Sequence, residues 1–412
     1  MKRLWTTAAV SALCLPLVAG VAFAGTNEPP SAAVVDEVHR NALVLDGHAD
    51  ILIESTPRRY YLPDGTSRVS LERLKQGGVD AVVLALAVGP GPQDAQGVAA
   101  ARTEIADKLA EVQARVQASD GQLVIARSAQ DIEQAEKDGK TAILLSFQNA
   151  RALGDDLDAI DGLYREGVRV FAFNHAGHNS WSDSSRPSDG EPVARHGGLS
   201  PIGREAVGRL NQKGVLIDVS QLSHDALLQT LELSKAPVVA THSNARGLRD
   251  HTRSLSDQEL DAIKANGGVV QVTPFNTYIV LLDEAAKARI RPVRVAHGLS
   301  ADFNAGNDGY GALAADKQQA FLDDLAQVQP RANVSDYVDH IEYIANRIGV
   351  DHVGIGTDFD HGAGVEGYNS AADSRAVTAE LLRRGYSAEQ ISAIWGGNFL
   401  RVLRSAQNAR QA

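Results

Sequence analysis

The sequence predicts an α/β fold, a closed (β/α)8 barrel of TIM type, and three observations support it. Short apolar runs alternate with amphipathic stretches over most of the 412 residues. The runs are rich in β-branched residues and lack apolar–polar alternation, which is typical of strands buried on both faces. Eight strands joined by helices form the pattern of a closed parallel barrel.

The predicted strands follow one another at fairly even intervals. They cover residues 42–46, 79–88, 142–147, 168–173, 215–219, 238–241, 268–273 and 352–357. Helical patterns cover residues 102–116, 157–166, 203–212, 225–233, 256–265 and 334–348. Ser256 opens the segment Ser-Asp-Gln-Glu, and a glutamate at the third following position predicts a capping box at that helix start.

An open doubly wound sheet is the alternative arrangement of these elements. The first predicted strand lacks a Gly-rich phosphate loop and is followed by Gly47-His48-Ala49-Asp50, which favours the barrel. We therefore expect a single barrel domain over residues 25–412. An insertion at about 274–333 breaks the rhythm, and such long loops often cover a barrel mouth.

The first 24 residues predict a secretory signal peptide. Lys2 and Arg3 precede an apolar run over residues 8–23, and Ala22-Phe23-Ala24 supplies small residues around a cut. The run is shorter than the roughly 20 apolar residues of a spanning helix. We expect a periplasmic or secreted mature chain without a membrane anchor.

Composition narrows the function classes. The net charge of −11 argues against nucleic acid, because phosphate binding requires clustered Lys and Arg. The one cysteine, Cys14, lies in the predicted signal peptide. A mature chain without cysteine forms no disulfide, so its stability must come from core burial.

Reactive side chains gather where the predicted strands end. In a barrel, active-site groups project from the C-terminal ends of the strands. The residues found there are His48, Asp50, Gln148, His175, Gln221, His242 and Asp358. Polar or reactive residues at six of the eight predicted strand ends indicate a chemical site.

Two of these positions suit a metal ion. His48 and Asp50 stand two residues apart, so both side chains can face the barrel mouth, and imidazole and carboxylate are ligands of zinc and related metals. Asp358 follows the last strand, where it could hold and deprotonate a metal-bound water. Taken alone, Asp358 also fits a capping aspartate for the next turn.

Several segments resemble the membrane (renal-type) dipeptidases, a family of zinc metallopeptidases. They follow the order of that family over nearly the whole mature chain: Leu45-Asp46-Gly47-His48-Ala49-Asp50, His175 with Trp181-Ser182-Asp183, Gly198-Leu199-Ser200-Pro201-Ile202-Gly203-Arg204-Glu205, Leu216-Ile217-Asp218-Val219-Ser220, Thr241-His242-Ser243-Asn244-Ala245-Arg246, Gly354-Ile355-Gly356-Thr357-Asp358-Phe359-Asp360 and Gly396-Gly397-Asn398-Phe399-Leu400-Arg401-Val402.

The resemblance implies a barrel of the metal-dependent hydrolase kind that hydrolyses a dipeptide or small amide with two zinc ions and a bridging water. By position, His48 and Asp50 would bind the first metal and His242 the second. His175 would bind substrate by stabilising the oxyanion, and Asp358 would orient the attacking water and shuttle its proton. Family members often form homodimers.

The resemblance also implies a substrate-binding role for Arg253, which would hold the free carboxylate of the substrate, a task suited to guanidinium. By itself, Arg253 would be interpreted as a solvated arginine at a helix start.

The pattern breaks at two metal positions. Gln148 stands where the family has a glutamate bridging both ions, and Gln221 stands where it has a histidine. A neutral amide brings no negative charge between two dications and binds zinc poorly. His48, Asp50 and His242 could together hold one ion, the usual three-ligand complement of a catalytic zinc site.

Two further histidines, His178 and His224, are near in sequence and could substitute as ligands. Three interpretations follow: a one-metal dipeptidase-like hydrolase, a two-metal dipeptidase with weak ligands, and a metal-poor or metal-free barrel. The last would act in periplasmic maturation of a peptide-derived product, as a different enzyme or an accessory binding protein. The second is disfavoured because ligand loss lowers metal affinity. We expect a metal-dependent dipeptidase-like hydrolase with one zinc ion rather than two, while the metal-free alternative stays open at this level.

Overall fold

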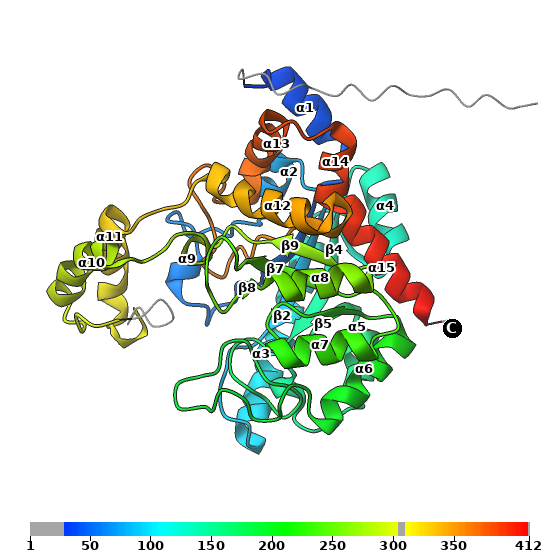
Figure 1. Ribbon diagram of the computed structural model, residues 1–412, viewed down its shortest axis with the longest axis horizontal. Helices are drawn as coiled ribbons and strands as arrows, with labels where there is room; N and C mark the ends of the chain where they lie inside the picture. Colours follow the sequence, from blue (N-terminus) through cyan, green and yellow to red (C-terminus); the bar gives the residue numbers. More distant parts are fainter. Residues whose placement is uncertain (1–28, 304–309, 411–412) are drawn as a thin grey trace, which may run out of the picture.

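The computed structural model describes residues 29–303 and 310–410, shown in Figure 1. The predicted signal peptide lies outside the described residues, so its cleavage stays a prediction. Within the described ranges, no helix combines the length and apolar character needed to cross a membrane.

Eight parallel strands form the barrel, in the order β1-β2-β4-β5-β6-β7-β9-β10. Their bounds are Leu45–Asp50 (β1), Ala81–Ala87 (β2), Thr141–Gln148 (β4), Val168–Ala172 (β5), Leu216–Asp218 (β6), Val239–Ala245 (β7), Val269–Val272 (β9) and Val353–Ile355 (β10). Hydrogen bonds of 2.8 Å from Asp358 N to His48 O, and from Asp50 N to Phe359 O, join the two ends of this order. The predicted barrel is confirmed, and each predicted strand corresponds to one of the eight.

Two short strands outside the barrel order were missed. β3 (Leu123–Ala126) pairs with the start of β4, and β8 (Ser254–Leu255) pairs with the end of β7. β3 has only four residues, and two of them are half-exposed. Such short elements carry little of the apolar pattern on which sequence reasoning relies.

The first strand is longer at its C-terminal end than predicted. β1 continues to Asp50 instead of ending at Asp46, and its register against β2 shifts between Asp46 and Ala49. Side chains two residues apart on a strand share a face. His48 and Asp50 are therefore held on the strand itself rather than on a loop.

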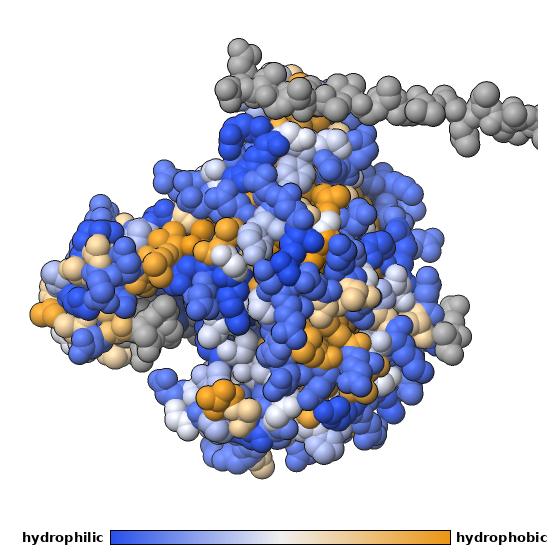
Figure 2. All heavy atoms as spheres, in the orientation of Figure 1, coloured by the Kyte–Doolittle hydropathy of each residue, from blue (hydrophilic) through white to orange (hydrophobic). Residues whose placement is uncertain are grey.

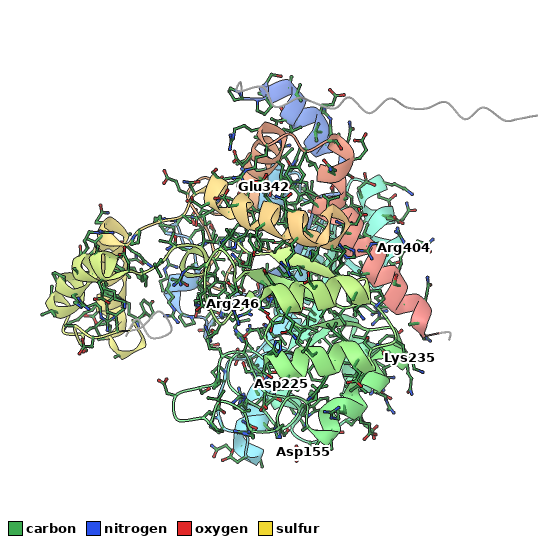
Figure 3. All side chains as sticks on the ribbon, viewed as in Figure 1. Asp155, Asp225, Lys235, Arg246, Glu342 and Arg404 are labelled. Atoms are coloured by element: carbon green, nitrogen blue, oxygen red, sulfur yellow. The ribbon has the colours of Figure 1, made fainter. Side chains whose placement is uncertain are left out.

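Helices surround the barrel in the layer that Figure 3 shows with its side chains, where Asp225 is labelled on α7, Glu342 on α12 and Arg404 on α15. The helix bounds are Ala32–Asn41 (α1), Leu71–Gly77 (α2), Ala95–Ala118 (α3), Ala129–Lys137 (α4), Ala159–Glu166 (α5), Pro201–Lys213 (α6), His224–Leu233 (α7), Asp257–Asn266 (α8), Val334–Ile348 (α12), Ser374–Arg383 (α13), Ala388–Ser392 (α14) and Asn398–Ala409 (α15). The capping box at Ser256 is confirmed, because its hydroxyl accepts from Glu259 N while the Glu259 carboxylate accepts from Ser256 N.

The segment after β9 is largely helical. It holds α9 (Asn276–Ile279), α10 (Glu284–Ala296) and α11 (Ala315–Val328). In Figure 1, α10 and α11 lie together to one side of the barrel. Figure 2 shows apolar residues gathered where these two helices join the rest of the molecule, on an otherwise mostly hydrophilic face. We call α10 and α11 the helical lobe.

Candidate active site

The predicted site residues lie where the barrel strands end, and all of them are buried. His48 and Asp50 end β1, Gln148 ends β4 and His242 lies within β7. The loops after β5, β6 and β10 carry His175, Gln221 and Asp358. The exposed fraction of each of these residues is at most 8 %.

His48 and His242 form the centre of the site. Their rings stack with centroids 3.9 Å apart, and both Nδ1 atoms contact the Thr241 hydroxyl, at 3.2 and 2.8 Å. Thr241 Oγ1 donates its own proton to Asp218 Oδ2 at 2.5 Å. A hydroxyl has one proton to give, so both imidazoles carry their proton on Nδ1. Each Nε2 atom therefore presents a lone pair.

The two Nε2 atoms have different surroundings. His48 Nε2 is buried and has no hydrogen-bond partner, while one oxygen each of Asp50 and Asp358 lies 3.9 Å away. His242 Nε2 faces the amide nitrogens of Gln148 and Gln221, at 3.4 and 3.1 Å. The unpartnered atom between two carboxylates fits a metal ligand, because a buried lone pair left alone is costly.

The residues that meet around His48 define where an ion fits. His48, Asp50 and Asp358 offer three ligand atoms within 4.8 Å of one another. His48, Asp218 and His242 form a second such group. His48 is common to both groups.

Asp218 is not available as a ligand. Its Oδ1 accepts from Ser220 N, Ser220 Oγ and Thr241 N, and its Oδ2 accepts from the Thr241 hydroxyl. This carboxylate therefore fixes the strand ends and the tautomer of both histidines. At the position where the family resemblance implies a second metal ion, the described residues lack a strong ligand set. The amides of Gln148 and Gln221 already face His242 Nε2 there.

His361 belongs to the site, although the sequence reasoning missed it. Its Nδ1 lies 2.7 Å from Asp50 Oδ2, its Nε2 lies 3.2 Å from His175 Nε2, and its ring stacks on Tyr60. Burial alone would lower the pKa of His361, but the Asp50 carboxylate raises it above the ordinary value. The sequence feature that could have identified His361 as a site residue is its position three residues after Asp358, on the same loop.

The contact with His361 also changes the pKa of Asp50. Burial would raise the pKa of Asp50, but the His361 imidazolium, with Lys108 and His48, lowers it below the ordinary range. Asp50 is thus an anion whose Oδ2 is held by His361 and whose Oδ1 faces His48. Because His361 holds Oδ2, the other oxygen of Asp50, Oδ1, is left to bind a metal.

His175 lies between the barrel and the His361 ring. Its Nδ1 is 3.1 Å from Val88 O, which requires a proton on Nδ1. Its pKa is well below the ordinary value, first through burial and then through the charge of His361. Its Nε2 accepts from His361 in this arrangement, so oxyanion stabilisation by His175 stays a prediction.

Asp358 takes a backbone conformation that few residues adopt. Its φ is 58°, and its N–H donates to His48 O at 2.8 Å. Burial raises the pKa of Asp358, while His361 and His48 act in the opposite direction. A carboxyl with a raised pKa beside a metal-type cluster suits proton transfer.

Arg253 is fully buried rather than solvated. Its guanidinium donates to the carbonyl oxygens of Ser220 and His242, the latter at 2.9 Å, and lies 5.8 Å from the Tyr278 ring centroid. It therefore ties together the loop after β6 and strand β7. Capture of a substrate carboxylate by Arg253 stays a prediction.

The two substitute ligands lie elsewhere. His178 Nε2 is 2.8 Å from Pro192 O, and its Nδ1 accepts from Ser184 N. His224 is exposed at the start of α7, 3.0 Å from Glu259. Neither belongs to the two groups of possible metal ligands described above.

A buried cluster of histidines and carboxylates at the C-terminal end of a parallel barrel places the chain among barrel hydrolases. The family model for membrane dipeptidases, peptidase family M19, matches residues 32–412. The chain belongs to this family and is a dipeptidase-family hydrolase.

Individual relatives agree with this assignment. The solved structure of the probable dipeptidase PvdM from Pseudomonas aeruginosa is 34% identical, covers 92% of this chain and 98% of that one, and has a TM-score of 0.78. A metallo peptidase from Rhodobacter sphaeroides, liganded with a phosphinate mimic of L-Ala-D-Ala, shares the fold at 23% identity, with 89% and 99% coverage and a TM-score of 0.66. The dipeptidase tcpJ of Claviceps purpurea is 28% identical over 351 residues, 84% of this chain and 71% of its own length.

Proposed function

We propose that this chain cleaves a peptide or small amide by means of a single metal ion, most simply zinc. The observation that carries the proposal is the unpartnered, buried His48 Nε2 between the carboxylates of Asp50 and Asp358. His48 and Asp50 would hold the ion, with Asp358 beside it. When bound, such an ion polarises the substrate carbonyl and makes water nucleophilic at neutral pH.

The protein groups supply binding, orientation and proton transfer. His361 holds Asp50 Oδ2 so that Oδ1 points to His48. Asp358 takes the proton of the attacking water and passes it to the leaving amine. Burial prepares Asp358 for this exchange because it raises the pKa toward the working pH.

Peptide substrates are proposed from the relatives. PvdM is a probable dipeptidase, tcpJ is a dipeptidase, and the Rhodobacter sphaeroides protein binds a phosphinate mimic of a dipeptide. We further propose export to the periplasm or outside the cell with a mature chain starting at Gly25. N-terminal sequencing of protein from the native host tests this; an intact Met1 would contradict it.

The test of the catalytic proposal combines metal content with turnover. Purified protein is incubated with excess zinc, dialysed and analysed by elemental mass spectrometry, and hydrolysis of Ala-Ala is followed before and after chelation. We expect about one ion per chain and hydrolysis that is lost with chelator and restored by zinc. A His48→Gln variant should lose both, whereas His224→Gln should keep both. Hydrolysis that persists in an ion-free protein would overturn the proposal.

A further inference from the structure

A cavity of about 730 Å³ opens between the barrel mouth and the helical lobe. His361 and Gly362, from the loop after β10, line one side, and residues of α9, α10 and α11 line the other. Ligand pockets commonly measure about 300–1,000 Å³ and take drug-sized molecules. His361, which pairs with Asp50, therefore belongs both to the proposed active site and to the wall of the cavity.

The charge of the cavity is opposite to that of the chain. Five arginines line it, Arg59, Arg68, Arg186, Arg294 and Arg331, and no aspartate or glutamate is found among its described lining residues. The whole chain has a net charge of −11. Since guanidinium groups pair with carboxylate and phosphate, this wall favours an anionic ligand.

Arg186 is the arginine best placed to meet such a ligand. It lies in the loop between β5 and α6, and its carbonyl accepts from Gly177 N, two residues from His175. Its guanidinium is half-exposed and has no hydrogen-bond or ion-pair partner among the described residues. Arg68, by contrast, donates to Tyr60 O.

Further positive charge lies around Arg186. The charge of Arg186 is among the causes that lower the pKa values of His175 and His251. Burial first, and then Arg253, Arg249 and Arg186, lower the pKa of His251 to about 4. His251 is therefore neutral near pH 7, and the guanidinium remains the local cation.

The helical lobe supplies the apolar wall. Ile290 of α10 and Phe321, Leu322 and Leu325 of α11 line the cavity. Leu322 and Leu325 are half-buried. Removing apolar surface from water is favourable, so this wall favours an apolar side chain on the ligand.

We propose that the cavity binds the part of a peptide substrate beyond the cleaved bond, and that the substrate is an anionic peptide longer than a dipeptide. Its terminal carboxylate pairs with Arg186, and an apolar side chain packs against the helical lobe. This proposal rests on the proposed hydrolase function, since it assigns the substrate class of that same site.

The test measures binding, so that it does not depend on turnover. The probe is Ala-Ala-Leu-Glu with its first peptide bond N-methylated against hydrolysis, titrated calorimetrically into the protein as purified. The comparison probes are the corresponding Ala-Ala-Leu-Gln amide, the N-methylated dipeptide Ala-Ala and inorganic phosphate. We expect the acidic tetrapeptide to bind at least tenfold more tightly than each of these, and the difference to shrink as salt screens the charges.

Variants localise the binding. Arg186→Gln should remove the tenfold preference for the acidic probe, while Arg186→Lys should keep part of it. Arg204→Gln, on the exposed face of α6, is the matched control and should change nothing. Leu325→Ala should weaken the acidic and amidated tetrapeptides by the same factor, about three- to fivefold.

Three results would overturn the proposal: equal binding of the acidic and amidated tetrapeptides, no effect of Arg186→Gln, or phosphate binding as tight as that of the peptide. The last would define a general anion site. If the protein binds the acidic probe as expected but hydrolyses no peptide, the proposed function fails and the cavity assignment stands.

Discussion

Restoring the two altered ligand positions is the sharpest test of the metal site. In the double variant Gln148→Glu, Gln221→His, a carboxylate and an imidazole replace the amides that now donate to His242 Nε2 at 3.4 and 3.1 Å. An ion at this position must first displace both hydrogen bonds. Because both amides share the single lone pair of His242 Nε2, they count as about one hydrogen bond, which opposes metal binding by about 1 kcal/mol, or roughly fivefold in affinity.

The double variant should therefore bind a second zinc ion at least about fivefold more tightly than the wild type. The added negative charge and the new imidazole increase this effect. Zinc affinity is measured by competition with a chromophoric chelator, ion content by elemental mass spectrometry, and turnover with Ala-Ala. We expect ion content to rise toward two per chain and hydrolysis to rise with it.

The control carries the same replacements on a surface helix, Gln113→Glu with Gln96→His, both exposed on α3. It should match the wild type in ion content and turnover. If the double variant also matches the wild type in both, Gln148 and Gln221 are not altered metal ligands, and the reasoning from their contacts is wrong.

The other predictions concern the proton-transfer residue, a close backbone contact and acid stability. Asp358→Asn should lower kcat about 10²–10⁴-fold with little change in Tm, because Asn tolerates the φ of 58° that Asp358 adopts; unchanged turnover would remove Asp358 from the mechanism. Gly203→Ala should destabilise the protein by about 1–3 kcal/mol because its Cβ would lie 2.0 Å from a backbone oxygen. Gly208 is exposed on the same helix, and a Cβ there would have no atom within 4 Å. Gly208→Ala should instead stabilise the protein by up to about 1 kcal/mol. Free energies of unfolding in urea that rank the two variants the other way would contradict this packing. Burial would raise the pKa of Glu380, but neighbouring arginines lower it to about 2, so its stabilisation is complete above its unfolded pKa near 4.5 and is lost as pH falls toward 2. Glu380→Gln should flatten this part of the stability–pH curve, and an unchanged slope would show that the ion pairs of Glu380 contribute nothing.

Sequence patterns located the barrel because its strands are buried on both faces. Runs such as residues 79–88 and 142–147 are apolar enough to be recognised without any structure, and they became β2 and β4. The capping box at Ser256 was readable because all of its groups lie within four residues. Elements with weak or very short patterns, such as β3 and β8, were not readable.

The site was predicted in part for the same reason. Residues that end a barrel strand converge by topology, so His48, Asp50 and His242 could be chosen from their positions. His361 and Arg186 lie further along their loops, three and fourteen residues beyond Asp358 and Ala172, where the direction of a side chain is set by tertiary contacts. The predicted role of Arg253 likewise depends on contacts that no local pattern encodes, and its guanidinium in fact holds two backbone carbonyls.

The sequence by itself determined the family and the barrel, and it predicted that Gln148 and Gln221 replace two metal ligands. It did so because each depends on residue identity and on spacing along one strand or helix. Only the tertiary structure decided that His48 Nε2 is left without a partner, that the amides of both glutamines face His242 Nε2, and that His361 forms an ion pair with Asp50. These relations join residues up to several hundred positions apart, and hydrogen bonds of about 3 Å are fixed by packing rather than by local sequence.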